Sequence, residues 1–514
     1  MRGPGGVEDQ RRVPMSRIAE LPSSLAHADR LFIDGEWVAP SSSATVEVID
    51  ASTGLPWVRV AAAQKADMSR AIGAARYAFD HRSWSRFSPV QRAEYLRRIA
   101  EELRKRESDI GQIWPRESGV IHSTAVAMAA SAGFAFDFYA DMASTFDFDE
   151  PVHPAWGGEY GIIAREPVGV VGAIVPWNAP LGLMVWKVAP ALLAGCTVVV
   201  KSAREAPGDG YILAEAARAA GLPAGVLNVV TAADRAVSEQ LVSDPRVDKI
   251  AFTGSTAAGR RIGSVLGERL ARMTLELGGK SAAVILDDYD LDSVAKELAL
   301  HQTNISGQFC ASLSRIIVTR SRHDEFVEAL AQHFGSVKVG DPFGPATQMG
   351  PLAMSKQRDK VEEYVAKGVQ DGATLLTGGG RPADLERGFY FEPTVFGNVD
   401  NSSAIAQEEI FGPVLVVVPA DDEEQAVELA NDSIYGLNSS VYTNDNDRGL
   451  EVARRLRAGT VGHNAYRGDF TMSFGGFKQS GVGREGGRVG LNSFLETKSI
   501  ILNERPDGFP ELKA

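Results

Sequence analysis

The chain has 514 residues, of which 44% are hydrophobic and 23% charged, as is typical of a soluble globular protein with large cores. Its formal net charge of −13, from 53 basic and 66 acidic residues, argues against nucleic acid and anionic membranes as main partners. The only two cysteines and the scattered histidines show no C-x-x-C or H-E-x-x-H spacing, so the sequence predicts no disulfide framework, no metal site and a cytoplasmic location.

Residues 1–29 predict a disordered leader, because they lack the apolar core of a signal peptide. Further along, residues 168–186 contain no charged residue and imitate a membrane span. Pro176, Asn178 and Pro180 interrupt that stretch, however. A strand, a tight loop and a helix explain these interruptions better than one spanning helix, so we expect no membrane insertion.

Strands and helices alternate regularly from about residue 165. The predicted strands are 168–175, 196–201, 225–230, 248–254 and 272–279, and the predicted helices are 181–193, 209–221, 235–242 and 256–267. This alternation predicts a parallel sheet covered on both faces. Ligands bind such sheets at the carboxyl ends of the strands. The candidate binding loops are therefore 176–180, 201–207, 254–259 and 276–280.

Helical patterns precede this unit at residues 67–108 and 120–143, and a second α/β domain is expected after it. Its predicted strands are 281–286, 314–319, 394–399, 414–420 and 439–443, and its predicted helices are 291–303, 323–334, 355–371 and 423–431. The tail, residues 492–503, predicts an edge strand that could pair with residues 157–169.

Several residues in these loops suit catalysis, but each is ambiguous alone. Glu276 is either a solvated or capping carboxylate or a general base whose pKa is raised by burial. Asn178 is either a turn residue or an amide that donates to an oxyanion. The turn at 252–260, FTGSTAAGR, suits an anion at a helix N-terminus, although it is neither a Rossmann G-x-G-x-x-G nor a P-loop. Cys310 is by composition a buried thiol, a nucleophile or a metal ligand.

Seven motifs, however, follow one another in a distinctive order. They are 176–178 (PWN), Lys201, 252–255 (FTGS), 276–279 (ELGG), 307–310 (GQFC), 409–413 (EIFGP) and 473–478 (SFGGFK). This ordered set resembles the aldehyde dehydrogenase superfamily from about residue 30 to about residue 505. The resemblance implies a Rossmann-like parallel-sheet cofactor domain, a second α/β catalytic domain and a small β element for oligomerisation. The cofactor domain is expected at 30–149 with 169–279, and the catalytic domain at 280–480. The oligomerisation strands are expected at 150–168 and 490–508.

The resemblance also implies a role for each catalytic residue. The Cys310 thiol would attack the aldehyde carbon, and the Asn178 amide and the Cys310 backbone N–H would hold the oxyanion. After hydride transfer to the nicotinamide, Glu276 would activate the water that hydrolyses the thioester. These roles agree with the chemistry of thiolates, preorganised donors and general bases. Gly307 and its small neighbours leave room for a carbonyl beside the sulfur, whereas Cys196 begins an apolar strand and is expected to be structural.

A dinucleotide is implied across the parallel sheet. Its expected contacts are Trp177, Lys201, Gly254, Ser255, Gly259, Glu409 and Phe411. The chain departs from a frequent family pattern after Lys201, because Arg204 stands where many members have a glutamate that binds both ribose hydroxyls, and Glu205 follows one place on. An arginine could meet a 2′-phosphate. NAD is therefore the expected cofactor, with NADP as the alternative.

The substrate channel is expected near Asn178, near Cys310 and before the last motif. Its candidate residues are Leu183, Trp186, Phe309, Phe470, Met472 and Phe474. This apolar, aromatic set favours a hydrophobic aliphatic or aromatic aldehyde, unless several of its members are core residues. Arg467 and Asp469 could instead meet a polar substrate such as a semialdehyde. Because the tail normally extends a neighbour's sheet in this family, a homodimer or homotetramer is implied.

Three other functional classes fit the sequence less well. A non-catalytic relative would be expected to lack Cys310 or Glu276, and both are present. A relative that passes the acyl group to coenzyme A generally lacks a base at the position of Glu276. The sequence around Glu276 and the segment 307–310 disfavour a glutamate-phosphate-type reductase. The sequence therefore predicts a hydrolytic, NAD(P)-dependent aldehyde dehydrogenase.

Overall fold

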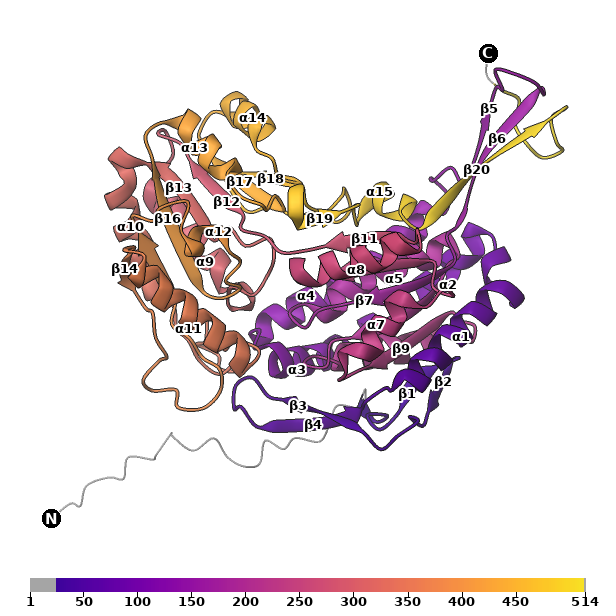
Figure 1. Cartoon of the computed structure of the whole chain (residues 1–514), viewed down its shortest axis with the longest axis horizontal. Helices are drawn as coiled ribbons and strands as arrows, with labels where there is room; N and C mark the ends of the chain where they lie inside the picture. Colours follow the sequence, from indigo (N-terminus) through magenta and orange to yellow (C-terminus); the bar gives the residue numbers. More distant parts are fainter. Residues whose placement is uncertain (1–24, 513–514) are drawn as a thin grey trace.

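The structure, a computed structural model, describes residues 25–512, which form two α/β lobes and a small projecting β-sheet (Figure 1). The predicted α/β class is confirmed. A separate hairpin consists of β3 (Thr45–Ile49) and β4 (Pro56–Ala61). Residues 1–24 of the predicted leader lie outside the described part. Leu25, by contrast, is buried in the core at 2% exposure, so the folded chain begins before residue 30.

The first lobe is built on an eight-stranded sheet. Its strands are β1 (Leu31–Ile33), β2 (Glu36–Val38), β7 (Val170–Ile174), β8 (Thr197–Ser202), β9 (Leu227–Thr231), β10 (Lys249–Thr253), β11 (Arg272–Glu276) and β19 (Gly481–Val482). The order is β19-β11-β10-β7-β8-β9-β1-β2, and the five strands from β11 to β9 are parallel, as the alternation predicts. The antiparallel edge strands β1, β2 and β19 are not predicted, because two or three residues are too short to show a pattern.

Helices cover both faces of this sheet. They are α1 (Lys65–His81), η3 (Trp84–Arg86), α2 (Pro89–Arg104), α3 (Glu107–Ser118), α4 (His122–Met142), α5 (Pro180–Ala194), α6 (Gly208–Ala219), α7 (Arg235–Ser243) and α8 (Thr256–Glu268). In β8, Val198 and Val200 pack into the core with α2, α4, α5 and α6, whereas Val199 packs on the other face with α1, α7 and α8. Side chains of a strand alternate between faces, which explains this division.

Residues 67–108 are largely helical, as the pattern predicts, but they do not form a single helix. The chain divides there into α1, η3 and α2, and α3 begins at the end of the stretch. The Ser88 hydroxyl accepts a hydrogen bond from the backbone N–H of Gln91 and caps α2, with Pro89 in the first turn. A proline at this position has no N–H to lose from the helix, so it starts α2 and ends the preceding segment.

The second lobe contains a seven-stranded sheet, as predicted for a second α/β domain. Its strands are β12 (Ala282–Ile285), β13 (Arg315–Thr319), β14 (Thr374–Thr377), β15 (Thr394–Gly397), β16 (Val414–Ala420), β17 (Asn438–Tyr442) and β18 (Thr460–His463). Its helices are α9 (Leu291–Thr303), η4 (Asn304–Gly307), α10 (Arg320–Gly335), α11 (Ser355–Gln370), α12 (Ala404–Gln407), α13 (Glu423–Asn431) and α14 (Asn446–Arg455). The chain then forms η5 (Lys478–Ser480), β19 and α15 (Gly487–Asn492), and Leu491 of α15 packs into the core of the first lobe with α5. The order is β14-β15-β16-β13-β12-β17-β18, and only β14 is antiparallel to its neighbour.

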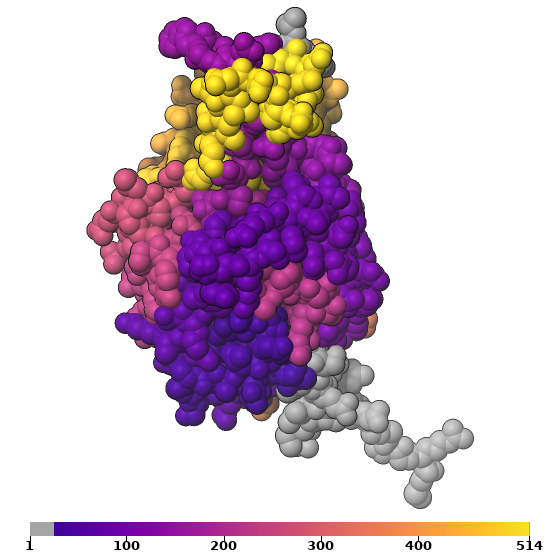
Figure 2. All heavy atoms as spheres, turned by 90° about the vertical axis from the view of Figure 1, so that its right-hand side faces the viewer, coloured from indigo at the N-terminus to yellow at the C-terminus, as the bar shows by residue number. Residues whose placement is uncertain are grey.

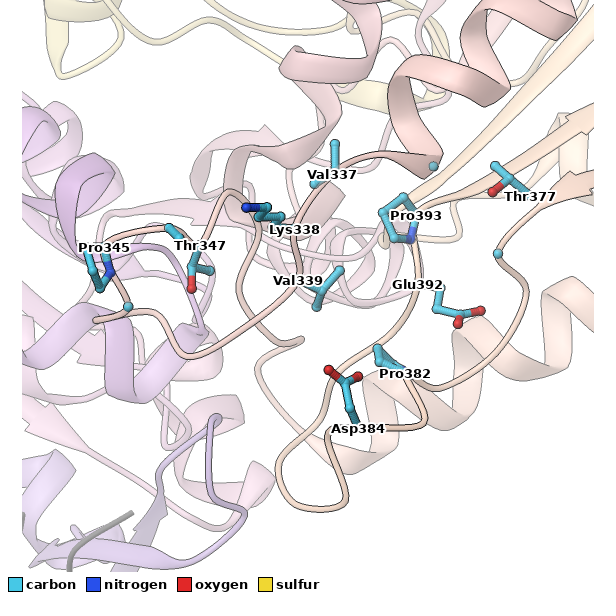
Figure 3. A pocket seen from close by; sticks show the side chains of 14 residues that line it. Val337, Lys338, Val339, Pro345, Thr347, Thr377, Pro382, Asp384, Glu392 and Pro393 are labelled. Carbon is cyan, nitrogen blue, oxygen red and sulfur yellow. The ribbon is translucent and has the colours of Figure 1, made fainter. Parts of the chain in front are cut away.

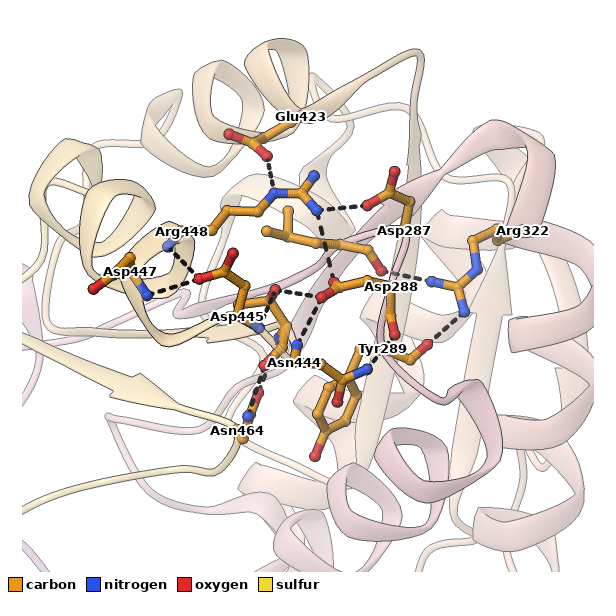
Figure 4. Close-up of polar contacts among 12 residues, drawn as sticks. Asp287, Asp288, Tyr289, Arg322, Glu423, Asn444, Asp445, Asp447, Arg448 and Asn464 are labelled. Atoms are coloured by element: carbon orange, nitrogen blue, oxygen red, sulfur yellow. Dashed lines mark hydrogen bonds and ion pairs between the residues drawn. The ribbon is translucent and has the colours of Figure 1, made fainter.

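Charged side chains tie α13 and α14 to the loop after β12 (Figure 4). The Arg448 guanidinium donates to Asp287 at 2.7 Å and to Glu423 at 2.8 Å. Asp288 accepts hydrogen bonds from the Thr443 hydroxyl and the Asn444 backbone N–H, each at 2.8 Å. The charges of α14 therefore stabilise this corner of the lobe.

The third sheet projects from the body of the molecule (Figure 1). It consists of β5 (Asp149–Val152), β6 (Tyr160–Pro167) and β20 (Leu495–Leu502) in the order β20-β6-β5. Strand β20 pairs antiparallel with β6, so the predicted pairing of the tail is confirmed. Figure 2 shows the C-terminal segment in yellow beside the β5–β6 hairpin at this end of the molecule.

The charge-free stretch 168–186 forms β7, a loop and the first half of α5. Within residues 25–512, no helix is both long and apolar enough to cross a membrane.

Candidate active site

Glycines allow the separate motifs to touch one another. A Cβ atom on Gly279 would lie 2.2 Å from the carbonyl oxygen of Cys310. A Cβ atom on Gly278 would lie 2.8 Å from a carboxylate oxygen of Glu409, and one on Gly475 would lie 2.6 Å from a carboxylate oxygen of Glu276. Any larger residue at these three positions would push the motifs apart. The structure thus brings Cys310, Glu276 and Glu409 together from distant parts of the chain.

Cys310 is partly exposed, whereas Cys196 is fully buried. Burial of the sulfur raises the pKa of Cys310 to about 12, and the negative charges of Glu409 and Glu276 raise it further. The Cys310 thiol is therefore protonated near neutral pH in the protein alone.

The turn before Cys310 has an unusual backbone. Ile305, Ser306 and Gly307 have φ values of 48°, 54° and 72°, a left-handed conformation that is strained for the first two. The Ser306 hydroxyl donates to the carbonyl of Gly350 at 2.8 Å, which helps to hold the turn. This turn leads directly into the Cys310 segment.

The loop that carries Asn178 is held by the end of α3. The Trp114 indole N–H donates to the Asn178 carbonyl at 2.9 Å, and the Ser118 hydroxyl donates to the Trp177 carbonyl at 2.6 Å. The Asn178 side-chain amide donates to the Gln308 carbonyl at 2.9 Å, two residues before the thiol. Asn178 therefore lies beside the Cys310 segment. Sequence patterns gave no signal for Trp114 or Ser118.

Glu276 ends β11 and is only 2% exposed. Neither of its carboxylate oxygens has a hydrogen-bond partner among the described residues. Burial raises the pKa of Glu276 well above its usual range, and the negative charge of Glu485 raises it further. The positive charges of Lys187 and Arg484 act in the opposite direction. This is the partly dry environment that a general base requires.

The candidate cofactor residues lie along the carboxyl ends of the first sheet. Ser255 caps α8 by accepting a hydrogen bond from the backbone N–H of Ala258, and Gly254 precedes it. Gly259 packs against Leu277, whose side chain would lie 2.4 Å from an added Cβ atom. The turn therefore serves helix capping and packing, and it also leaves a helix N-terminus for an anion.

Two other groups of candidate cofactor residues lie nearby. The rings of Trp177 and Phe411 meet edge to face at 5.5 Å. One Glu409 carboxylate oxygen accepts a hydrogen bond from the Gly279 backbone N–H at 3.1 Å. Lys201 lies near the end of β8, where burial lowers its pKa.

Arg204 is an exposed side chain whose charge is paired locally. Its guanidinium donates to the carboxylate of Glu205 at 2.9 Å, and the Arg204 side chain is 58% exposed. Because a negative charge lies directly beside it, Arg204 is a weaker anchor for a 2′-phosphate than an isolated arginine would be.

Aromatic side chains lead from the interior toward Cys310. Trp186 stacks on Phe470 with ring centroids 4.9 Å apart, and Phe470 stacks on Phe474 at 4.5 Å. Phe470 and Phe474 belong to the same apolar cluster as Phe309 and Cys310. This continuous stack supports the predicted channel.

The remaining channel candidates differ in their positions. Leu183 packs against the core cluster that contains Trp186. Met472 is 73% exposed and lies outside the stack. Arg467 is exposed, and the exposed Asp469 accepts hydrogen bonds from Thr471.

Sequence reasoning missed two aromatic residues beside Phe309. The rings of His301 and Tyr466 stack at 4.4 Å, and the ring of His301 meets Phe309 edge on at 4.9 Å. Burial lowers the pKa of His301 to about 4, so this imidazole is neutral near pH 7.

A cavity of about 620 Å³ lies elsewhere in the second lobe (Figure 3). Its walls are loops around Lys338, Thr347 and Asp384, and none of the predicted site residues lines it. Across residues 25–512, no group of three or more His, Cys, Asp or Glu side chains is placed to hold a metal ion.

The chain is similar to known proteins over most of its length. Residues 37–500 match the family described as "Aldehyde dehydrogenase family". Geranial dehydrogenase of Castellaniella defragrans is 42% identical over 92% of this chain and 98% of its own length. The 3-succinoylsemialdehyde-pyridine dehydrogenase of a Pseudomonas species is 41% identical over 91% of this chain and 98% of its own. A crystal structure of a Mycobacterium tuberculosis aldehyde dehydrogenase complexed with NAD⁺ has a TM-score of 0.90 and 43% identity, covering 94% of this chain and 99% of that one.

Proposed function

The chain belongs to the aldehyde dehydrogenase family, and from this premise we propose that it oxidises a hydrophobic aldehyde to the acid with NAD, using Cys310 as the nucleophile. One observation carries the proposal. Cys310, a partly exposed residue whose sulfur is buried, lies where the buried Glu276 carboxyl, the Asn178 loop and an aromatic stack meet.

The residues around the first sheet fit a dinucleotide. The N-terminus of α8 suits the pyrophosphate, Lys201 and Glu409 suit the riboses, and Trp177 and Phe411 flank the nicotinamide position. Within residues 25–512 the Lys201 side chain donates no hydrogen bond, so its ammonium group is available to a ligand. When bound, NAD supplies the hydride acceptor and a positive charge on its oxidised ring. We assign most of the cofactor contacts to the first lobe, and the nucleophile, with Glu409 and Phe411, to the second.

The geometry supports the following roles for the residues around Cys310. The Cys310 sulfur forms a bond to the carbonyl carbon as the thiol proton passes to solvent water. The Asn178 amide and the Cys310 N–H would donate to the oxyanion formed on the carbonyl oxygen. Once the carbon is oxidised, a thioester remains on Cys310. Glu276 takes a proton from water, the water oxygen bonds to the acyl carbon, and the carbon–sulfur bond breaks to release the acid.

The substrate proposal rests on the stack formed by Trp186, Phe470 and Phe474. An apolar wall favours an apolar chain, and each buried CH₂ contributes about 0.8 kcal/mol. The similarity to geranial dehydrogenase supports this choice. A polar semialdehyde is the second candidate, because Arg467 is exposed nearby and another relative is named for a semialdehyde.

Two further properties belong to the same proposal. The free cysteines Cys196 and Cys310 suit a reducing, cytoplasmic location. Strand β20 lies at the edge of its sheet, where it is available to extend a neighbour's sheet in a homodimer or homotetramer.

A panel of aldehydes assayed with NAD and with NADP tests the proposal. We expect kcat/KM to rise from acetaldehyde to hexanal, benzaldehyde to be accepted, and NAD to be preferred. A higher kcat/KM for succinic semialdehyde than for hexanal would overturn the apolar assignment. Preference for NADP would show that Arg204 binds a 2′-phosphate despite Glu205.

A further inference from the structure

A second, much smaller cavity of about 10 Å³ lies inside the second lobe. Lys280 and Ser281 line it from the turn before β12, Arg315 from the first residue of β13, and Asn438 from the first residue of β17. The end of α13 and residues 435–437 and 456–458 complete the wall.

Four buried polar atoms on these residues have no hydrogen-bond partner in the described part of the chain. They are Lys280 Nζ, Ser281 Oγ, Arg315 Nε and Asn438 Oδ1. Lys280 is only 3% exposed and Arg315 only 1%. Buried polar groups are almost always bonded, so four around one cavity indicate a ligand.

The charges around the cavity are predominantly positive. The Arg315 guanidinium donates to neutral acceptors, the Asn401 side-chain oxygen and the Ala430 carbonyl, each at 2.8 Å. Within residues 25–512, neither Lys280 nor Arg315 has a carboxylate at ion-pair distance. Burying unpaired charges is unfavourable, so a ligand that carries a negative charge suits this cavity.

Size narrows the choice of ligand. A cavity of about 10 Å³ holds one water molecule or an ion of similar size, which excludes phosphate and sulfate. We propose that this cavity binds one halide ion, with Lys280, Arg315 and Ser281 as its donors. Asn438 contributes an acceptor instead, so a water molecule is the competing occupant that the experiment must exclude. The proposal does not depend on the reaction at Cys310.

Halide binding is expected to depend on pH through Lys280. Burial lowers the pKa of Lys280 to about 7, and the positive charges of Arg315 and Lys360 lower it further, whereas Glu409 and Glu408 act in the opposite direction. Arg457 also lines the cavity. Burial lowers the pKa of Arg315, and the negative charge of Asp432 acts in the opposite direction. Because a bound anion favours the ammonium form, binding takes up a proton and weakens as the pH rises above about 7.

The direct test is crystallography of the wild-type protein with bromide. We expect an anomalous bromine signal within hydrogen-bond distance of Lys280 Nζ and Arg315 Nε. Density without an anomalous signal would mean that water occupies the cavity, and it would overturn the proposal. This measurement needs no variant and so does not depend on the folding of a mutant.

A solution test compares Tm in chloride and in gluconate at equal ionic strength. For the wild type and for Lys338→Met, an exposed control, we expect a saturable rise of Tm with chloride that is larger at about pH 6 than at about pH 9. For Lys280→Met and Ser281→Ala we expect the rise to be lost or reduced. An equal chloride response in all four proteins would contradict a site at Lys280.

Discussion

The Lys187 ammonium group donates a hydrogen bond to the Glu485 carboxylate, although the two side chains are only 0% and 2% exposed. The same ammonium group donates to the Thr253 hydroxyl at 2.7 Å. This buried ion pair lies beside Glu276, since both of its charges act on the pKa of that carboxyl. It therefore connects the stability of the first lobe with the proton chemistry of the site.

Lys187→Met leaves the Glu485 carboxylate buried without its partner. Removing one member of a buried ion pair costs about 3–5 kcal/mol, so we expect a large loss in the free energy of unfolding, measured in urea. The double variant Lys187→Met/Glu485→Leu removes both charges and is expected to recover part of that loss. A double variant that is less stable than Lys187→Met alone would contradict this account.

Cys310→Ala is expected to abolish aldehyde oxidation, because no other described side chain in the cluster can hold the carbonyl carbon covalently. NAD binding, followed by quenching of protein fluorescence, is expected to persist. Cys196→Ala is the matched control, since this thiol is buried beside the Phe494 carbonyl, and it should retain most activity. Near-normal turnover by Cys310→Ala would refute the proposed nucleophile.

Glu276→Gln separates acylation from hydrolysis. If Glu276 activates the deacylating water, the variant releases one rapid burst of NADH per site and then nearly stops. Mass spectrometry of the stalled enzyme should show an acyl adduct on Cys310. Steady turnover at the native rate, without an adduct, would remove Glu276 from this role.

Asp209→Asn tests a buried carboxyl behind the Asn178 loop. Burial raises the pKa of Asp209 to about 7, although its carboxylate accepts a hydrogen bond from the Leu181 backbone N–H. The folded state thus binds a proton more tightly than the unfolded state, and stability is lost as the pH rises from about 4 through about 7. Because an asparagine side chain does not ionise, Asp209→Asn should not lose this stability as the pH rises.

Above pH 7 we therefore expect the free energy of unfolding of Asp209→Asn, measured in urea, to exceed that of the wild type by on the order of a few kcal/mol. Near pH 4 we expect the two proteins to have similar free energies of unfolding. The nearby Glu117 carboxyl also has a raised pKa, caused by burial and by the charge of Asp209. Identical pH profiles for the two proteins would show that Asp209 is not protonated in the fold.

Phe474→Ala opens the aromatic stack next to Cys310. Because the wall is lost and water enters, we expect the rise of kcat/KM with aldehyde chain length to flatten. The exposed Met472→Ala is the control and should keep the wild-type trend. The same trend in Phe474→Ala as in the wild type would place the substrate elsewhere.

Local sequence patterns were sufficient for much of the fold. The predicted strand 414–420 and the predicted helix 291–303 have the same bounds as β16 and α9. Buried parallel strands are continuous apolar runs, and helices show their own period, so neighbouring residues carry the necessary information. The division of residues 67–108 depended on a cap at Ser88 and was missed.

The ordered motifs likewise predicted Cys310, Glu276 and Asn178 as one set, because residue types and their order can be read directly. Only the tertiary structure decided which side chains hold that set. Trp114 bonds to Asn178 across 64 positions, and Lys187 bonds to Glu485 across 298. Such pairs depend on the order in which strands assemble into sheets and on where loops cross. Local sequence patterns contain no information about either, because they reflect only neighbouring residues.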